Sequence, residues 1–177
     1  PGAGDESLPI GAAFALLDDL NGGDGAVFEQ AAPFKHAYLG PEATAEDLES
    51  LAHHPFIEEH YERIDNAGPE AVAEVLRSGE ICALFLGEME FGPRALGHRS
   101  LIADPSKPES VKRINNAIKM RDFWMPFTPS ILDERVDDYV LNPKKLPCDF
   151  MTVAFDTTEL GRQHLAAAVH PADLTAR

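Results

Sequence analysis

Short apolar runs alternate with amphipathic stretches along this chain. The run ICALFL at residues 81–86 predicts a buried strand, and shorter apolar runs at 100–103 and 149–155 predict two more. Apolar residues at helical spacing, together with capping residues, predict helices over residues 8–20, 45–52, 69–78, 109–120, 133–141 and 159–169. Strands that alternate with helices indicate an α/β fold.

The strand predicted at 81–86 leads into a loop rich in glycine and proline, residues 87–100, that carries Arg94, His98 and Arg99. Glycines let backbone N–H groups approach an anion closely, and arginine offers bidentate donors to phosphate or carboxylate. Loops that follow strands are common ligand sites in α/β proteins. The loop matches neither the P-loop nor the dinucleotide-binding glycine pattern, so the residues alone predict an anion-binding loop and no more.

Charge is distributed unevenly along the 177 residues. The formal net charge of −15 argues against general binding to nucleic acid or to anionic membranes. Seven of the 15 lysine and arginine residues nevertheless fall in the segment from Arg94 to Arg121. An acidic protein that gathers its positive charge in this way is expected to bind a small anionic ligand there. The alternative is a solvated basic helix.

The sequence also indicates a location. No apolar run is long enough to cross a membrane, and the first residues do not have the form of a signal peptide. The two cysteines, Cys82 and Cys148, fit neither a disulfide framework nor a metal-binding spacing. We therefore expect a protein of the reducing cytoplasm with no membrane partner.

Three histidines, His53, His54 and His60, lie close together in the sequence. Pro55 interrupts the helical spacing between them, and their neighbours are polar. A solvated surface is therefore favoured over a metal site at these positions.

The segment MEFGPRALGHRS, residues 89–100, closely resembles the signature of the carbamoyltransferase family that includes the nodulation-factor and antibiotic O-carbamoyltransferases. At the two ends of the chain, GDES at 4–7 resembles the family's G-D-x-G segment, and DLTAR at 173–177 resembles its D-G-T-x-R segment. The resemblance continues through residues 101–105, 115–121 and 126–130.

This resemblance implies a division of the chain into parts of two domains. Residues 1–20 would be the tail of an upstream Kae1-like domain of the actin-like ATPase superfamily, and residues 21–34 a flexible linker. Residues 35–177 would be a YrdC-like domain, a twisted mixed sheet with flanking helices that is incomplete at its C-terminus. A homodimer is compatible with this organisation.

The resemblance also implies the chemistry. The YrdC-like domain would use carbamoyl phosphate and ATP, with Mg²⁺, to form carbamoyl adenylate and release pyrophosphate. The upstream domain, which carries an iron site, would pass the carbamoyl group to a hydroxyl of a small-molecule acceptor. No nucleic acid partner is implied, and this fragment alone is expected to be inactive.

Particular residues of this chain take roles by the same resemblance. Arg94 and Lys119 would be catalytic, because fixed cations offset the repulsion between two anions and stabilise charge at the α-phosphorus. Asp5 would be a metal ligand only together with histidines of the upstream domain. The expected set for carbamoyl phosphate and the phosphates of ATP is Arg94, Arg99, Lys119, Arg121 and Arg177.

Other positions are interpreted as structural or as departures from the family pattern. His98 is expected to stabilise the turn, and Glu90 to be a structural partner of a loop arginine. Ser7 stands where glycine is usual, and Glu88 and Met125 stand where arginine is usual.

Two alternative functions stay open at this point. One is a YrdC-like enzyme of threonylcarbamoyl-adenylate or hydrogenase-maturation chemistry. The other is a non-catalytic domain that binds phosphate or nucleotide.

Overall fold

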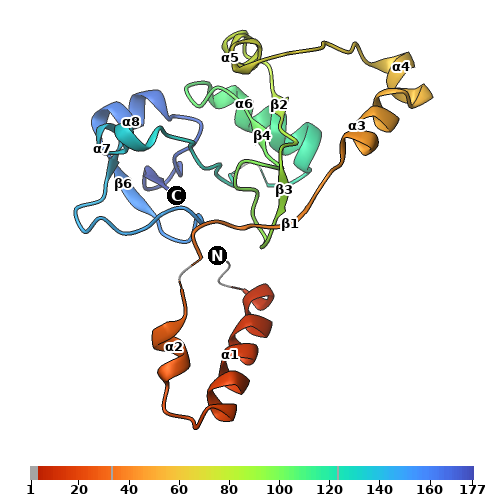
Figure 1. The fold of residues 1–177 in the computed structure, drawn as a ribbon. Helices are drawn as coiled ribbons and strands as arrows, with labels where there is room; N and C mark the ends of the chain where they lie inside the picture. Colours follow the sequence, from red (N-terminus) through yellow and green to blue (C-terminus); the bar gives the residue numbers. More distant parts are fainter. Residues whose placement is uncertain (1–3, 33, 123) are drawn as a thin grey trace.

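The computed structural model describes residues 4–32, 34–122 and 124–177, and Figure 1 shows how its elements are arranged. Residues 1–3 of the predicted upstream tail, residue 33 of the predicted linker and residue 123 lie outside the described residues. The rest of the chain combines helices with short strands, so the predicted α/β class is confirmed. Within these ranges no helix has both the length and the apolar character needed to cross a lipid bilayer.

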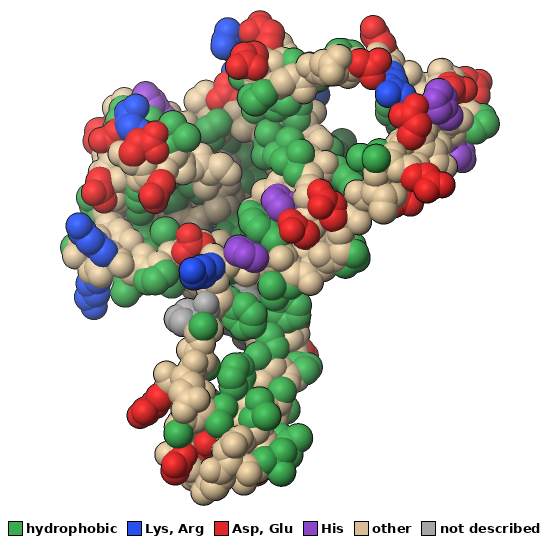
Figure 2. All heavy atoms as spheres, in the orientation of Figure 1, with side chains coloured by type: hydrophobic (Ala, Val, Ile, Leu, Met, Phe, Trp, Pro, Cys, Tyr) green, Lys and Arg blue, Asp and Glu red, His purple; other side chains and the backbone are tan. Residues whose placement is uncertain are grey.

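The N-terminal residues form a helical hairpin that projects from the rest of the molecule (Figure 1). Its elements are η1 (Asp5–Ser7), α1 (Leu8–Leu20) and α2 (Ala26–Gln30). Asp18 accepts the N–H of Gly25 across the turn, and the rings of Phe14 and Phe28 lie 6.2 Å apart. The helix predicted over 8–20 is confirmed, and α2 lies inside the segment predicted to be a linker. No residue of α1 is buried, and Figure 2 shows hydrophobic side chains along this hairpin.

A strand and three helices follow, namely β1 (Tyr38–Glu42), α3 (Ala45–Ala52), α4 (Pro55–His60) and α5 (Pro69–Arg77). The start of α3 is fixed by a capping box. The Thr44 hydroxyl accepts the N–H of Asp47 at 3.1 Å, and the Asp47 carboxylate accepts the N–H of Thr44 at 2.9 Å. These two bonds satisfy backbone donors that the first turn of a helix leaves without partners.

The strands pair in antiparallel fashion throughout the described residues. The pairs are β1 with β3 (Glu88–Glu90), β2 (Cys82–Ala83) with β4 (Leu101–Ile102), and the three-stranded order β5 (Val140–Leu141), β6 (Phe155–Thr157), β7 (Thr175–Ala176). The sequence predicts one twisted mixed sheet, whereas these strands are divided among three small sheets. Strands of two to five residues carry too few ladder bonds to unite them.

The apolar run at 81–86 is extended and paired, but it is not buried. Beyond β2, the N–H of Leu84 donates to Ser100 at 2.7 Å and that of Leu86 to His98 at 3.0 Å. Phe85 is 59% exposed and Leu86 52% exposed, so the prediction of a buried strand was wrong. Similarly, the strand predicted over 149–155 begins only at Phe155, because the residues before it form a turn.

The helix predicted over 109–120 changes character half-way. It begins as α6 (Pro108–Arg113) and continues as the π-helix η2 (Ile114–Lys119), which ends where Met120 takes the left-handed conformation at φ 46°. Single π-helical turns inside helices are rare and are often found at functional sites. The sequence pattern predicts the helix but not this extra residue in its turn.

The buried core lies in the C-terminal third of the chain. Leu165, Ala168 and Val169 form its centre, with Ile131 and Tyr139 packed against them. The surrounding helices are η3 (Asp133–Arg135), α7 (Val136–Tyr139) and α8 (Glu159–His164). Helices predicted to reach residues 141 and 169 end earlier, because residues 140–141 pair as β5 and residues after 164 turn into the core.

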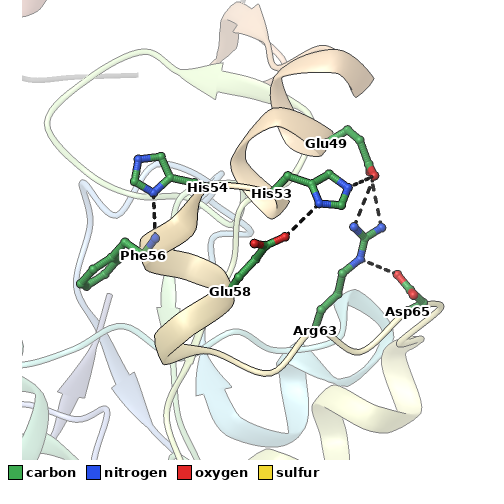
Figure 3. A network of polar contacts seen from close by, with 7 residues as sticks. All are labelled: Glu49, His53, His54, Phe56, Glu58, Arg63 and Asp65. Atoms are coloured by element: carbon green, nitrogen blue, oxygen red, sulfur yellow. Dashed lines mark hydrogen bonds and ion pairs between the residues drawn. The ribbon is translucent and has the colours of Figure 1, made fainter.

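A chain of charged side chains ties α3 to α4 and to the segment after it (Figure 3). His53 lies between two carboxylates, at 3.1 Å from Glu58 and 3.0 Å from Glu49. Arg63 contacts Glu49 at 3.4 Å and Asp65 at 2.7 Å. Among the residues that the structure describes, no group of three or more histidine, cysteine or acidic side chains is arranged to hold a metal ion.

The contacts of His53 lead to a prediction about its titration. Hydrogen bonds to Glu58 and then Glu49 raise the pKa of His53. Protonated His53 therefore stabilises the α3–α4 junction below about pH 6.5, the ordinary pKa of histidine, and this contribution is lost as pH rises through the raised pKa. In Glu58→Gln, the pKa of His53 measured by NMR titration should fall toward its ordinary value. Glu59→Gln is the matched control, and an unchanged pKa in Glu58→Gln would contradict the assignment.

Candidate functional site

One carboxylate organises the loop that carries the arginines. Glu90, at the end of β3, accepts backbone N–H groups through both of its oxygens. Oε1 accepts from Leu96 at 2.6 Å and from His98 at 2.9 Å, and Oε2 accepts from Arg99 at 3.1 Å. The predicted structural role of Glu90 thus takes a different form: its partners are backbone groups and not an arginine side chain. Hydrogen bonds to an ionised acceptor are about twice as strong as neutral ones, so this carboxylate fixes the path of the loop.

An aromatic stack supports the same loop from β1. The Tyr38 hydroxyl donates to the Leu96 carbonyl at 2.9 Å, and the Tyr38 and His98 rings stack with centroids 3.7 Å apart. His98 is itself fixed by a 2.8 Å contact between Nδ1 and the Glu88 carbonyl. Gly87 faces this ring at φ 41°, where an added Cβ would lie 2.9 Å from His98. These contacts agree with the structural role predicted for His98.

Arg99 is committed to the loop's own backbone. Its guanidinium donates to the carbonyls of Leu86, Gly87 and His98, at 3.1 Å for the last two. It also lies over the Phe85 ring, 3.7 Å from the centroid. The family resemblance implies that Arg99 binds ligand, whereas here most of its donors are satisfied by protein carbonyls. Arg99 therefore holds the two sides of the loop together.

Unlike Arg99, Arg94 contacts neither the loop carbonyls nor an aromatic ring among the described residues. It lies at the exposed part of the loop, two residues after Gly92, which has φ 109°. In the described portion of the chain its guanidinium has neither a hydrogen bond nor an ion pair. Its donors are therefore free among the described residues, and the predicted binding of an anion by Arg94 stays a prediction.

The second cationic element is the turn that follows the π-helix. Asn115 is completely buried, and its side-chain oxygen accepts Arg121 Nε at 2.6 Å while its Nδ2 donates to the Met125 carbonyl at 3.3 Å. The Asn115 carbonyl also accepts the Arg121 N–H at 3.1 Å. The Arg121 guanidinium lies over the Phe127 ring, 4.4 Å from the centroid. Arg121 is thus oriented by contacts on three sides.

One nitrogen of Arg121 has no acceptor. Its NH2 is buried and, among the described residues, makes no hydrogen bond. A buried donor left without a partner costs about 1–3 kcal/mol, and more when it is charged. An anion that supplied an acceptor here would remove this penalty. Asn115 and Phe127, which create the arrangement, were not identified as site residues from the sequence.

The remaining predicted site residues are placed as follows. Lys119, two residues before Arg121, is exposed, and within the described ranges its ammonium has no hydrogen bond or ion pair. Arg177 follows β7 and is exposed. Hydrogen bonds from the backbone N–H and hydroxyl of Thr175 lower the pKa of Asp173, and the charge of Arg177 adds the smallest contribution. Asp5 is exposed in η1, and its metal role stays a prediction that depends on residues outside this chain.

A family model described as the carbamoyltransferase C-terminus matches residues 73–177, a range that includes both cationic elements. The chain belongs to the carbamoyltransferase family. The resemblance predicted from residues 89–100 is confirmed.

Several relatives match the whole chain. Nodulation protein NolNO of Sinorhizobium fredii is 34% identical over an alignment of 184 positions, which covers 100% of this chain and 25% of that protein. Nodulation protein NolO of Bradyrhizobium diazoefficiens is 34% identical over 188 residues, 100% of this chain and 31% of the relative. An uncharacterized protein of Methanocaldococcus jannaschii is 35% identical over 179 residues, with coverage of 100% and 28%. The chain therefore spans about a quarter to a third of the length of these relatives.

The role of Glu90 can be tested with an isosteric change. Glu90→Gln keeps one acceptor oxygen and replaces the other by a donor, so we expect the free energy of unfolding to fall by about 1–3 kcal/mol in urea denaturation. Glu88→Gln is the matched control, because Glu88 is exposed on the same strand and its carboxylate has no bond in the described structure. Equal stability of the two variants would refute the role assigned to Glu90.

The two loop arginines should respond differently to lysine. Arg99→Lys removes the fork that reaches several carbonyls and should lower the free energy of unfolding by about 1–2 kcal/mol. Arg94→Lys should change it by less than about 0.5 kcal/mol, as exposed substitutions usually do. Thermal and urea unfolding measure both, and a larger loss for Arg94→Lys would reverse the assignment.

Proposed function

We propose that this chain carries the phosphate-binding part of a carbamoyl-adenylate-forming site. In the complete protein, carbamoyl phosphate and ATP, with Mg²⁺, would be converted to carbamoyl adenylate, and the carbamoyl group would then pass to a hydroxyl of a small-molecule acceptor. Membership of the carbamoyltransferase family supports the transferase class. The observation that carries the proposal further is the buried NH2 nitrogen of Arg121, which has no acceptor among the described residues.

Arg121 is suited to bind phosphate because its orientation is set before any ligand arrives. Asn115 and Phe127 hold the guanidinium, so an anion that binds NH2 would not have to order a flexible side chain. Lys119 adds a second charge two residues earlier on the same turn. Arginine provides directional donors and lysine a mobile point charge, a combination that fits a polyphosphate.

The chemistry needs fixed positive charge more than it needs acid or base catalysis. Carbamate, formed by hydrolysis of carbamoyl phosphate with release of phosphate, would attack the α-phosphorus of ATP through an oxygen as the bond to pyrophosphate breaks. Both partners are anions, so cations must offset their repulsion and the charge on the departing pyrophosphate. Arg94, Lys119 and Arg121 would supply it.

The groups expected at this site are a nucleotide phosphate, Mg²⁺ and iron, and the described residues fit them to different degrees. The orphaned Arg121 donor fits a nucleotide phosphate. Mg²⁺ is commonly held by substrate phosphates with few protein ligands, so it would enter the site together with ATP. An iron site would need Asp5 together with ligands from outside this chain.

The test is carbamoyl-phosphate-dependent release of pyrophosphate from ATP by the complete protein. Arg94→Ala and Lys119→Ala should each reduce the rate about 100-fold or more, the usual effect of removing one charge-stabilising donor. Both side chains make no intramolecular bonds in the described structure, so the loss would report on ligand and not on folding. Arg121→Ala should be at least as damaging.

Lys112→Ala is the matched control, because Lys112 is exposed on α6 and has no hydrogen bond or ion pair in the described part of the chain. It should keep the wild-type rate. ATP binding without pyrophosphate release would favour the non-catalytic binding domain. Release that is insensitive to all three substitutions would place the reaction elsewhere in the protein.

A further inference from the structure

Arg121 is held in place without a carboxylate. The arginines that pair with an acidic side chain in the described structure are Arg63, Arg77, Arg113, Arg135 and Arg162. These arginines are exposed, whereas Arg121 is half-buried and, among the described residues, has no ion pair. Buried charges in proteins are usually paired, and a chain with 30 acidic residues does not lack carboxylates. The choice of a different partner for Arg121 therefore needs an explanation.

The place of a carboxylate is taken by the amide of Asn115. Its Oδ1 accepts Arg121 Nε at 2.6 Å, and its Nδ2 donates to the Met125 carbonyl at 3.3 Å. An acceptor on one side and a donor on the other fix which way the amide faces. The Asn115 carbonyl also accepts the N–H groups of Met120 and Arg121. One fully buried residue therefore fixes both the backbone and the guanidinium of Arg121.

We propose that Asn115 is a positioning residue whose neutral amide keeps the charge of Arg121 available to a phosphate ligand. This inference rests on the proposed function, in which Arg121 binds phosphate. An aspartate at this position could accept the same hydrogen bond from Nε. It would also offset the charge of the guanidinium and repel an anion, because opposite and like charges interact strongly in a partly buried site. An amide orients the arginine and leaves its charge for the ligand.

The same contact decides which part of the guanidinium a ligand meets. Nε is occupied by Asn115, and the guanidinium lies over the Phe127 ring, 4.4 Å from the centroid. In the described part of the chain the two terminal nitrogens make no hydrogen bond, and one of them, NH2, is buried. Two parallel N–H donors match two oxygens of one phosphoryl group. The arrangement therefore favours a phosphoryl group that meets Arg121 through its two terminal nitrogens.

The experiment measures binding of inorganic pyrophosphate to the complete protein by calorimetry, together with the thermal unfolding temperature. The binding that belongs to this site is the part that Arg121→Ala removes. Asn115→Ala releases the guanidinium and should weaken this binding about tenfold. Asn115→Asp keeps an acceptor for Nε but adds a counter-charge. We expect it to weaken binding about 100-fold and yet to unfold at a higher temperature than Asn115→Ala.

This order of the variants separates positioning from a merely structural role. If Asn115 only supported the fold, the less stable variant, Asn115→Ala, would also be the weaker binder, and that result would overturn the inference. Asn116→Asp is the matched control, because Asn116 is exposed on the same π-helix and its side chain makes no bond in the described residues. It adds the same charge without a contact to the guanidinium, so its affinity should stay within about twofold of wild type.

Two further results would overturn the inference while the proposed function stands. One is binding by Asn115→Asp within about threefold of wild type, since a counter-charge should cost more than that. The other is wild-type affinity in Asn115→Ala, a result that holds even if Asn115→Asp does not fold. If wild type does not bind pyrophosphate, or Arg121→Ala binds it as tightly as wild type, the proposed function itself fails.

Discussion

The hydrogen bonds from three backbone N–H groups to the Glu90 carboxylate are the constraint on which the candidate site depends. They fix the path of the residues after β3, and this path in turn positions the other contacts of the loop. Tyr38 can reach the Leu96 carbonyl, His98 can stack on Tyr38, and Arg99 can span the loop. Because the acceptor is a charge and the donors are backbone groups, the arrangement does not depend on the identities of the donor side chains.

The positive charge of the chain is used in two distinct ways. Arg99 has its donors directed to protein carbonyls, and its role is to close the loop. Arg94 and Lys119 have no protein partners among the described residues, and Arg121 is oriented but only partly satisfied. A cluster of cations in a sequence therefore does not indicate a cluster of equivalent ligand groups. Their backbone and aromatic neighbours decide which of them are available.

Much of this could be predicted from the sequence. The helix at 8–20 and the helix at 45–52 follow from local patterns, because their determinants lie within a few residues of one another. The partners of Arg99 could not be predicted, since the carbonyls it reaches belong to residues up to 13 positions away. The exposure of Phe85 was also missed, because hydropathy indicates what prefers to be buried and not what is available to cover it.

The site residues that were missed share one cause. Asn115 appears in the sequence as an unremarkable polar residue in a helix, and its importance comes from complete burial against Arg121. Phe127 belongs to an aromatic segment whose sequence is also compatible with ordinary side-chain packing in a core or a loop. Neither role can be recognised until the turn between residues 119 and 121 is known.

The π-helix has a consequence for how this site tolerates change in the chain. Each residue of a helix advances the chain by about 100° around the axis and about 1.5 Å along it. Deletion of a single residue between Ile114 and Lys119 would return this segment to ordinary α-helical geometry. The side chains of Lys119 and Arg121 would then point in different directions relative to Asn115. Point substitutions in this segment preserve the π-helical geometry, whereas a one-residue deletion does not. Within this helix, chain length is as much a determinant of the site as amino-acid identity.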